Sequence, residues 1–447
     1  MAATLAPDPQ IMKAVETLDY RATPGDVAAT SGLNLNLAER GLLALASDAG
    51  AHLQVAETGD IVYQFPKNFR AVLRNKFWRL RWQAWWEKVW NVLFYLIRIS
   101  FGTILIVSIV LIFVTIAVIL IALSSSRDGD SNGGGGGRSR SGGGIFFLPR
   151  FWISDWMWFY DPYPSRSHRD RKVRKSRSSE DSEMNFLEAV FSFLFGDGNP
   201  NANLDDRRWS QIATVIRNNK GAVTAEQIAP YLDDLGDSSA QEYEEYMLPV
   251  LSRFNGRPEV SPEGELVYHF PELQTTVKQH KTRSVSDYLR EYPWQFSQAS
   301  SGQKMMAIGL GAVNIVGALV LGSLLADGAI AAELGGLVAF VASIYWLLLG
   351  YGIAFLTVPL LRYFWIQWRN SKIESRNQQR QERAQIVQRP TPKLQQKLAY
   401  AGQFATETVI DREDLAYTTE KDLAQQEFEQ SDKIDEEWRR RLEEGNG

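Results

Sequence analysis

The side chains that could perform chemistry are few in this chain of 447 residues. Cysteine is absent, which excludes disulfides, thiolate metal sites, iron–sulfur ligation and a cysteine nucleophile. The four histidines lack the spacing of metal ligands. Ser301 and Lys304 match the S-x-x-K string of acyl-transfer enzymes, but the companion motifs of that class are missing from the sequence. We therefore expect neither an enzyme nor a bound cofactor or metal.

Acidic residues gather between residues 205 and 277, where thirteen Asp and Glu side chains accompany six Arg and Lys. Asp233 and Asp234 could bind a cation, but no calcium-loop pattern surrounds them, so a solvated acidic face is the simpler interpretation. A net negative charge repels a polyanion, since phosphate neutralisation by cations dominates nucleic-acid affinity. We therefore expect this region to bind protein rather than nucleic acid.

The strongest internal signal is a segment that occurs twice. Residues 55–66 read VAETGDIVYQFP, and residues 260–271 read VSPEGELVYHFP. Glycine permits a tight turn, and alternating Val, Tyr and Phe suit a half-buried β-hairpin. We interpret the shared residues as structural: Gly59, Tyr63, Phe65, Gly264, Tyr268 and Phe270. A duplicated unit is the simplest source of this repeat.

Each hairpin ends a segment that has the pattern of a small α+β module, residues 1–73 and residues 205–277. Apolar residues recur at helical spacing in three stretches before the hairpin. Asn36 is placed to cap the third stretch of the first module, and Gly50 is placed to end it. Three helices followed by a hairpin resemble the winged-helix domain, in which the third helix often enters the DNA major groove.

Three apolar stretches are long enough to cross a bilayer: residues 99–123, 305–326 and 334–361. The last two flank an acidic turn and are predicted to form a transmembrane hairpin. The fold class is therefore an α+β multi-domain membrane protein, with two winged-helix-like modules and α-helical transmembrane segments.

The remaining segments connect these parts. Residues 124–144 form a Gly/Ser-rich linker, residues 161–204 contain a basic run and an amphipathic stretch, and residues 278–304 form a polar connector. Residues 145–160 are apolar and aromatic but short, and they carry Asp155. They either cross the membrane, re-enter it or lie on its surface.

Two further sets of residues have the composition of membrane contacts. Residues 74–98 are basic and aromatic, which predicts an amphipathic helix at the headgroup level. Its interface residues are Trp78, Trp82, Trp85, Trp86, Trp90, Arg79 and Arg81. The start of one long transmembrane helix is the alternative. Close helix packing and an interhelical hydrogen bond are predicted at Gly311, Asn314, Gly317 and Gly322.

Charge predicts the topology. Lys and Arg flank the apolar stretches, whereas the turn between the last two is acidic. The positive-inside rule then places both modules and the charged, helical C-terminal tail (residues 362–447) on the cytoplasmic side or its organellar equivalent. This arrangement requires residues 145–160 to return across the membrane; the alternative places the modules on opposite sides. The tail is expected to be solvated or to dock a partner.

The repeated hairpin, the membrane stretches and the string FLFGDGNPN at residues 193–201 resemble an uncharacterised family of cyanobacterial and chloroplast integral membrane proteins. Plant relatives sometimes carry an iron–sulfur cluster biosynthesis label, but a chain without cysteine offers no thiolate ligand for a cluster. The resemblance implies a thylakoid or plasma membrane in a photosynthetic organism, and it implies no catalytic residue.

The combined expectation is a membrane-anchored scaffold or assembly factor whose partners are the lipid bilayer and other proteins. A membrane-tethered nucleic-acid-binding regulator and a transporter are the alternatives, and the oligomeric state stays open.

Overall fold

A computed structural model describes residues 8–76, 78–127, 185–278, 282–326, 328–411, 414–429, 438, 439 and 442. The described residues are mixed α/β, and 67% of them are helical. It divides into two compact units: Met1–Ser100 with Phe191–Gln298 and Thr357–Gly447, and Phe101–Val190 with Ala299–Leu356. Most of the expected linker, the expected return segment (residues 145–160) and the basic run (residues 166–177) lie outside the described residues.

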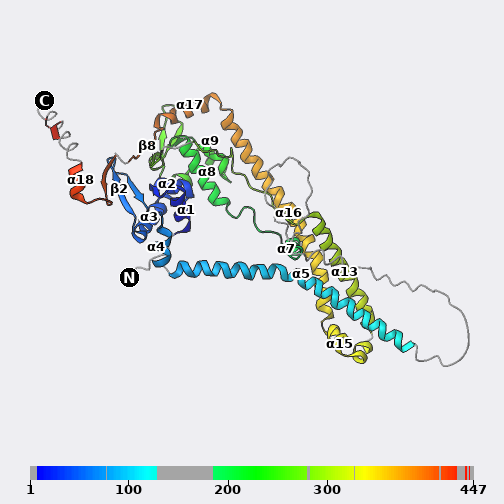
Figure 1. Ribbon diagram of the computed structural model, residues 1–447. Helices are drawn as coiled ribbons and strands as arrows, with labels where there is room; N and C mark the ends of the chain where they lie inside the picture. Colours follow the sequence, from blue (N-terminus) through cyan, green and yellow to red (C-terminus); the bar gives the residue numbers. More distant parts are fainter. Residues whose placement is uncertain are drawn as a thin grey trace, which may run out of the picture. The chain divides into compact units, whose positions relative to one another are not determined.

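The first unit begins with three helices and a small sheet (Figure 1). The helices are α1 (Pro9–Thr17), α2 (Pro24–Ser31) and α3 (Leu35–Ala49), and the strands are β1 (Arg21–Ala22), β2 (His52–Ala56) and β3 (Ile61–Gln64). The antiparallel strands lie in the order β1-β3-β2. Val15, Val27 and Leu42 are fully buried where the three helices meet.

The start of each helix in this segment is fixed by a side chain. Thr23 and Asp26 form a reciprocal capping box at α2, which satisfies two backbone N–H groups. The predicted cap of α3 was wrong by two residues, because Asn34 occupies the cap position and accepts a hydrogen bond from the Asn36 N–H. Asn34 has the extended backbone that a cap needs, whereas Asn36 is already helical.

A second segment repeats this order of elements. It contains α8 (Leu204–Asn218), β4 (Ala222–Val223), α9 (Ala225–Ile228), α10 (Ser238–Glu242), α11 (Leu248–Phe254), β5 (Arg257–Val260) and β6 (Leu266–His269), with short 3-10 turns at Ala229–Tyr231 and Glu245–Met247. Its strands lie in the order β4-β6-β5. Gly59 and Gly264 occupy the same place in the two hairpins, with φ of +88° and +86°.

The two segments pack directly against each other through α2 and α8 and share one buried core. Gly32 ends α2 with φ of +73°, and a Cβ there would lie 2.9 Å from the Cβ of Trp209. The Arg217 guanidinium of α8 lies 2.7 Å from the carboxylate of Asp26, and both side chains are buried. The segments therefore form one continuous body within the first unit.

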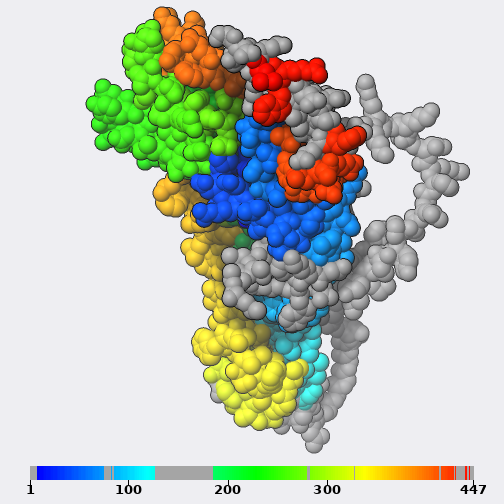
Figure 2. Space-filling model, turned by 90° about the vertical axis from the view of Figure 1, so that its left-hand side faces the viewer, coloured from blue at the N-terminus to red at the C-terminus, as the bar shows by residue number. Residues whose placement is uncertain are grey.

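The described C-terminal residues up to Glu429 complete this body rather than forming a free solvated tail (Figure 2). They form the C-terminal part of α16 (Tyr345–Gln388), α17 (Pro392–Ala401), β8 (Thr408–Val409), β9 (Leu415–Thr418) and α18 (Leu423–Glu429). β8 pairs in parallel with β7 (Thr275–Thr276), which follows the short helix α12 (Pro271–Gln274), and β9 pairs antiparallel with β2. Within the tail that was predicted to be helical, residues 415–418 form a strand, because the open edge of β2 offers backbone hydrogen bonds.

Within the described residues, three helices are long and apolar enough to cross a membrane: Trp85–Ser125 within α5 (Trp78–Arg127), α13 (Ser301–Leu325) and α16. A short helix, α4 (Phe69–Lys76), precedes α5. Residues 78–123 lie in one continuous helix, which agrees with the alternative of one long helix rather than with a separate surface helix at residues 74–98 before a span at residues 99–123. No glycine or proline interrupts residues 78–101, so nothing in the sequence ends the helix there.

The last predicted span differs in the opposite way, since residues 334–361 do not form one helix. The structure has α14 (Ala329–Leu334), α15 (Gly336–Ser343) and the start of α16 at Tyr345. Gly335 and Gly336 have positive φ and separate α14 from α15, and Ile344 ends α15. Within the second unit, α15 packs against α5 and α13 around Ile112, Leu321 and other buried apolar residues.

Candidate functional site

The repeated hairpin residues lie in the core of the first unit. Tyr63, Phe65, Tyr268 and Phe270 are almost fully buried. The Phe65 N–H donates to the Tyr20 carbonyl at 2.7 Å, and the Phe270 N–H donates to the Gly221 carbonyl at 2.8 Å, at equivalent places. These positions hold the hairpin against the helices.

The predicted interface tryptophans lie along α5, and four of them are about half exposed: Trp82, Trp85, Trp86 and Trp90. Ring contacts connect Trp82 with Trp85 at 5.5 Å and Trp85 with Trp86 at 6.2 Å. The side chains of Trp78, Arg79 and Arg81 lie outside the described part of the structure.

The predicted packing residues of α13 lie against neighbouring helices of the second unit. A Cβ at Gly311 would lie 2.7 Å from Phe355, and a Cβ at Gly317 would lie 3.0 Å from Ile112. Gly322 lies so close to Tyr345 that a Cβ would overlap its hydroxyl. Asn314 is fully buried and donates a hydrogen bond to the Ser108 hydroxyl of α5.

The main feature that the sequence did not reveal is an extended segment, residues 289–296, which we call the strap. It lies antiparallel to α16, and side chains of α16 bind its backbone at four levels. These levels are Arg380 to the Leu289 carbonyl, Asn377 to both backbone groups of Glu291, Asn370 to both backbone groups of Trp294, and Arg362 to the Phe296 carbonyl. The eighteen residues of helix from 362 to 380 rise about 27 Å, and the seven residues of extended chain from 289 to 296 span about 23 Å. Because these lengths are similar, each strap residue can stay beside its partner on α16.

The strap matters because it lies within the polar connector predicted at residues 278–304, which is thereby fixed along its middle. Asn370 and Asn377 each exchange two hydrogen bonds with one strap residue at 2.8–2.9 Å. A signal for this contact exists in the sequence, because amide side chains seven residues apart lie on one helical face. The spacing shows that the two asparagines share a face of α16, but it does not show which segment of the chain binds that face.

Ion pairs reinforce the strap near its start. Glu291 accepts hydrogen bonds from Arg376 at 2.6 and 2.8 Å and lies 2.8 Å from Arg380. Burial alone would raise the pKa of the Glu291 carboxyl, but the two arginines more than offset it, so its pKa lies below the ordinary value. Arg380 is 1% exposed and also pairs with Asp233, so this acid of the predicted solvated face is engaged by the chain itself.

A second buried cation comes from α17. Lys397 is 2% exposed, and its ammonium group pairs with Glu226 at 2.9 Å and with Glu244. Burial lowers the pKa of Lys397, but the two carboxylates outweigh it and the net pKa is raised. Glu244 also accepts a hydrogen bond from the Tyr268 hydroxyl at 2.8 Å. The acidic second segment is therefore neutralised in part by cations from the C-terminal residues.

The FLFGDGNPN string forms a polar cluster after α7 (Phe186–Phe195). Arg362 donates to the Phe193 carbonyl at 3.0 Å, which places a cation at the C-terminus of α7, where the helix dipole favours it. Gly196 has φ of +81°, and a Cβ there would overlap the Arg362 guanidinium. Asp197 accepts a hydrogen bond from the Gln298 N–H at 2.8 Å. The string therefore holds α7, α16 and the end of the strap together.

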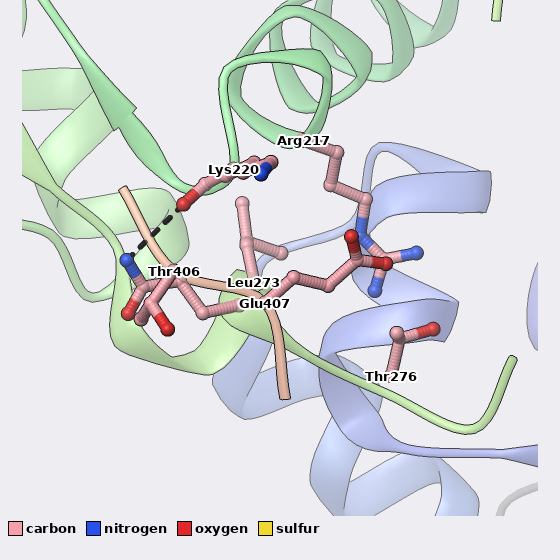
Figure 3. Close-up of a pocket in the computed structure, with 7 residues that line it drawn as sticks. Arg217, Lys220, Leu273, Thr276, Thr406 and Glu407 are labelled. Atoms are coloured by element: carbon pink, nitrogen blue, oxygen red, sulfur yellow. Dashed lines mark hydrogen bonds between the residues drawn. The ribbon is translucent and has the colours of Figure 1, made fainter. Parts of the chain in front are cut away.

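A small depression lies where α8, α12 and the C-terminal residues meet (Figure 3). It is lined by Arg217, Lys220, Leu273, Gln274, Thr276, Thr406 and Glu407. The dashed line in Figure 3 is the hydrogen bond from the Gln274 amide to the Lys220 carbonyl at 3.2 Å. Arg217 is paired with Asp26, which also accepts a hydrogen bond from Thr276 at 2.9 Å. The depression thus lies at a contact between segments, and Arg217, Gln274 and Thr276 bind other segments of the chain.

Among known proteins, the chain is 38% identical over 448 aligned positions to a protein of Arabidopsis thaliana named "Uncharacterized protein At5g03900, chloroplastic". The alignment covers 97% of this chain and 82% of the relative. The chain belongs to the same family as this Arabidopsis protein. No family model matches the chain, and no solved structure matches it. The At5g03900 family thus includes a chloroplast member, and the described part of this member has three helices that could span a membrane.

Proposed function

We propose that the chain is a membrane-anchored scaffold or assembly factor of a plastid-type or cyanobacterial membrane. Its two repeated segments would be winged-helix modules that bind protein partners. The matching strand orders β1-β3-β2 and β4-β6-β5 support both the winged-helix assignment and a tandem duplication. The chloroplast location in the name of the Arabidopsis relative supports the choice of membrane.

The observation that carries the proposal is that Arg253, a cation of α11, binds the first module and not an outside ligand. This helix is the counterpart of the one that would read DNA in a winged helix. Arg253 donates to the Gly32 carbonyl at 2.8 Å and stacks over the Trp209 ring at 4.3 Å. Asn34 also donates to the Ser252 carbonyl of α11 at 3.3 Å. The second module thus uses this helix to hold the first, which disfavours insertion into a groove.

The corresponding helix of the first module offers a surface of different chemistry. On α3, Leu37 and Leu43 are 59% and 54% exposed, beside the opposite charges of Glu39 and Arg40. Leu37 and Leu43 are six residues apart and lie on either side of the exposed surface of the helix. Exposed leucines suit a protein partner better than a phosphate backbone. We infer that α3 is the main docking element.

The contact between the modules also supports a common side of the membrane for both. α5 leads from the first module into a span, and α8 of the second module packs on α2 of the first. An even number of crossings must then separate them, and residues 145–160 are the proposed return segment.

The test is affinity purification from native membranes, with quantitative mass spectrometry of the wild type and two variants. Leu37→Glu with Leu43→Glu should remove the specific partners. Val260→Glu is the control, since Val260 is 60% exposed but lies on β5 of the second module, and it should keep them. Equal recovery by both variants would refute docking through α3. Salt-sensitive binding of DNA or RNA in a mobility-shift assay would favour a nucleic-acid regulator, and substrate flux in proteoliposomes would favour a transporter.

A further inference from the structure

Two tryptophans flank the apolar part of α16, which ends at Leu361 just before Arg362. Trp346 and Trp365 are 78% and 43% exposed and lie nineteen residues apart on this helix. At about 1.5 Å per residue their separation is about 29 Å, which matches the roughly 30 Å thickness of the hydrocarbon core. Tryptophan is enriched at both interfaces of a bilayer. In a membrane spanned by this helix, Trp365 would lie at the headgroup level of one leaflet.

Around Trp365 lies a cluster that we call the Trp–Arg patch: Trp294, Trp365, Trp368, Arg369 and Lys372. The Arg369 guanidinium lies 4.9 Å from the ring centre of Trp294 and 5.1 Å from that of Trp365. The Lys372 ammonium lies 3.8 Å from the ring centre of Trp368. Cation–π contacts thus hold both cations at the level of the rings.

The position of Trp294 is set by the strap rather than by the patch itself. The Asn370 side chain accepts a hydrogen bond from the backbone N–H of Trp294 at 2.8 Å and donates one to the backbone carbonyl of Trp294 at 2.9 Å. The Trp294 and Trp365 rings meet edge to face at 5.5 Å. Two fixed rings therefore flank one guanidinium, which limits the directions in which its N–H groups can point.

Both cations of the patch are exposed, and across the described residues neither pairs with a carboxylate. The one acid of the strap, Glu291, is engaged by Arg376 and Arg380 instead. A guanidinium carries five N–H donors and an ammonium three, and ring faces satisfy none of them as a strong acceptor would. The patch thus presents donors to an anion that the described residues do not supply.

We propose that the Trp–Arg patch binds the phosphate of an anionic lipid headgroup in the leaflet that faces the modules. The tryptophan rings suit the boundary between headgroups and acyl chains, while Arg369 and Lys372 reach the phosphate. Arginine binds phosphate in a bidentate manner, and its stacked plane is already ordered. Free phosphate has the same chemistry, but the location of the patch at the end of a membrane span selects the lipid.

The test uses the full chain in phosphatidylcholine vesicles with spin-labelled phosphatidylglycerol or spin-labelled phosphatidylcholine. Electron spin resonance measures the motionally restricted fraction of each label. A basic residue near a membrane surface contributes a factor of about five in affinity for anionic lipid. We expect the wild type to prefer the phosphatidylglycerol label, and Arg369→Gln with Lys372→Gln to lower that preference at least about fivefold.

The matched control is Lys67→Gln with Arg389→Gln, which removes the same charge from exposed positions outside the patch. It should leave the preference within about twofold of the wild type. Equal losses in both double variants would reduce the effect to general surface charge and overturn the site. Displacement of the label by inorganic phosphate as readily as by unlabelled phosphatidylglycerol would overturn the lipid assignment. If the double variant does not insert, the exposed single variant Lys372→Gln must still lower the preference, and no change in it refutes the proposal.

Discussion

Replacement of Lys397 by methionine is the most direct test of how the C-terminal residues hold the second module. Lys397 is 2% exposed and neutralises Glu226 and Glu244. Methionine keeps much of the apolar stem but leaves two carboxylates facing each other without a cation. Removal of one partner from a buried ion pair costs about 3–5 kcal/mol. We expect the lower end, about 3 kcal/mol, because Glu226 is 31% exposed and water can reach it.

The assay is amide hydrogen exchange of the full chain in micelles, read by mass spectrometry over α17 and β6. If the opening free energy of α17 falls by about 3 kcal/mol, its amides exchange about 150-fold faster, since 1.4 kcal/mol corresponds to a factor of ten. The control is Lys393→Met on the same helix. Lys393 is 74% exposed and pairs with Glu265, so its loss should cost no more than about 1 kcal/mol.

The same exchange experiment can test whether the loss of charge balance causes the effect. A triple variant with Lys397→Met, Glu226→Gln and Glu244→Gln removes the cation together with both acids. It should recover most of the lost protection, because replacing a whole buried ion group is often nearly neutral. Similar exchange in the Lys397 and Lys393 variants would refute the reasoning, as would a triple variant that exchanges as fast as the single one.

Three further outcomes follow from the geometry. The difference in thermal stability between the wild type and Glu291→Gln should shrink as the pH falls from about 5 to about 3. The pKa of the Glu291 carboxyl is lower in the folded protein than in the unfolded chain, so this carboxylate stabilises the fold fully only above its unfolded pKa. The stabilisation is lost as the pH falls through the folded pKa. Gly196→Ala should lower the free energy of unfolding by about 1–3 kcal/mol in chemical denaturation, since its φ of +81° strains an L-residue and its Cβ displaces Arg362. Single cysteines at the exposed positions Ser47 and Ser239 should react with an impermeant maleimide from the same side of sealed vesicles, and opposite sides would contradict the proposed topology.

The sequence alone located the elements whose cause is local. The repeated hairpin turns at Gly59 and Gly264, where positive φ favours glycine, and the spacing of the two copies is visible in the letters. The same holds for the apolar parts of α5 and α13, because about twenty residues without charge have few alternatives in water or lipid. The predicted span at residues 334–361 is instead divided among α14, α15 and α16. Helix ends were less certain, as the shift of the α3 cap from Asn36 to Asn34 illustrates.

The elements that the sequence did not predict depend on distant partners. Residues 415–418 form β9 because β2 offers an unpaired edge more than three hundred residues earlier. The acids Asp233 and Glu244 look solvated when only their own segment is considered, yet Arg380 and Lys397 approach them from α16 and α17. A charge balance computed over one segment therefore misjudges its surface when the neutralising cations come from another.

The two hairpins show how a repeated fold treats its open edges. In the first module β9 covers the edge of β2, and the Thr419 N–H donates to the Leu53 carbonyl at 2.9 Å. By the register of the two hairpins, Leu53 corresponds to Pro258 of β5, which has no N–H to offer a further strand.

The Tyr400 hydroxyl also donates to the Val260 carbonyl of β5 at 3.1 Å. One edge is thus paired and the other is blocked by proline and a side chain, both of which suppress edge-to-edge association. With the edges of β2 and β5 occupied in these ways, strand addition at these positions is a poor route for partner binding. The occupied edges thus favour the exposed surface of α3 as the one through which a scaffold of this family would recruit other proteins.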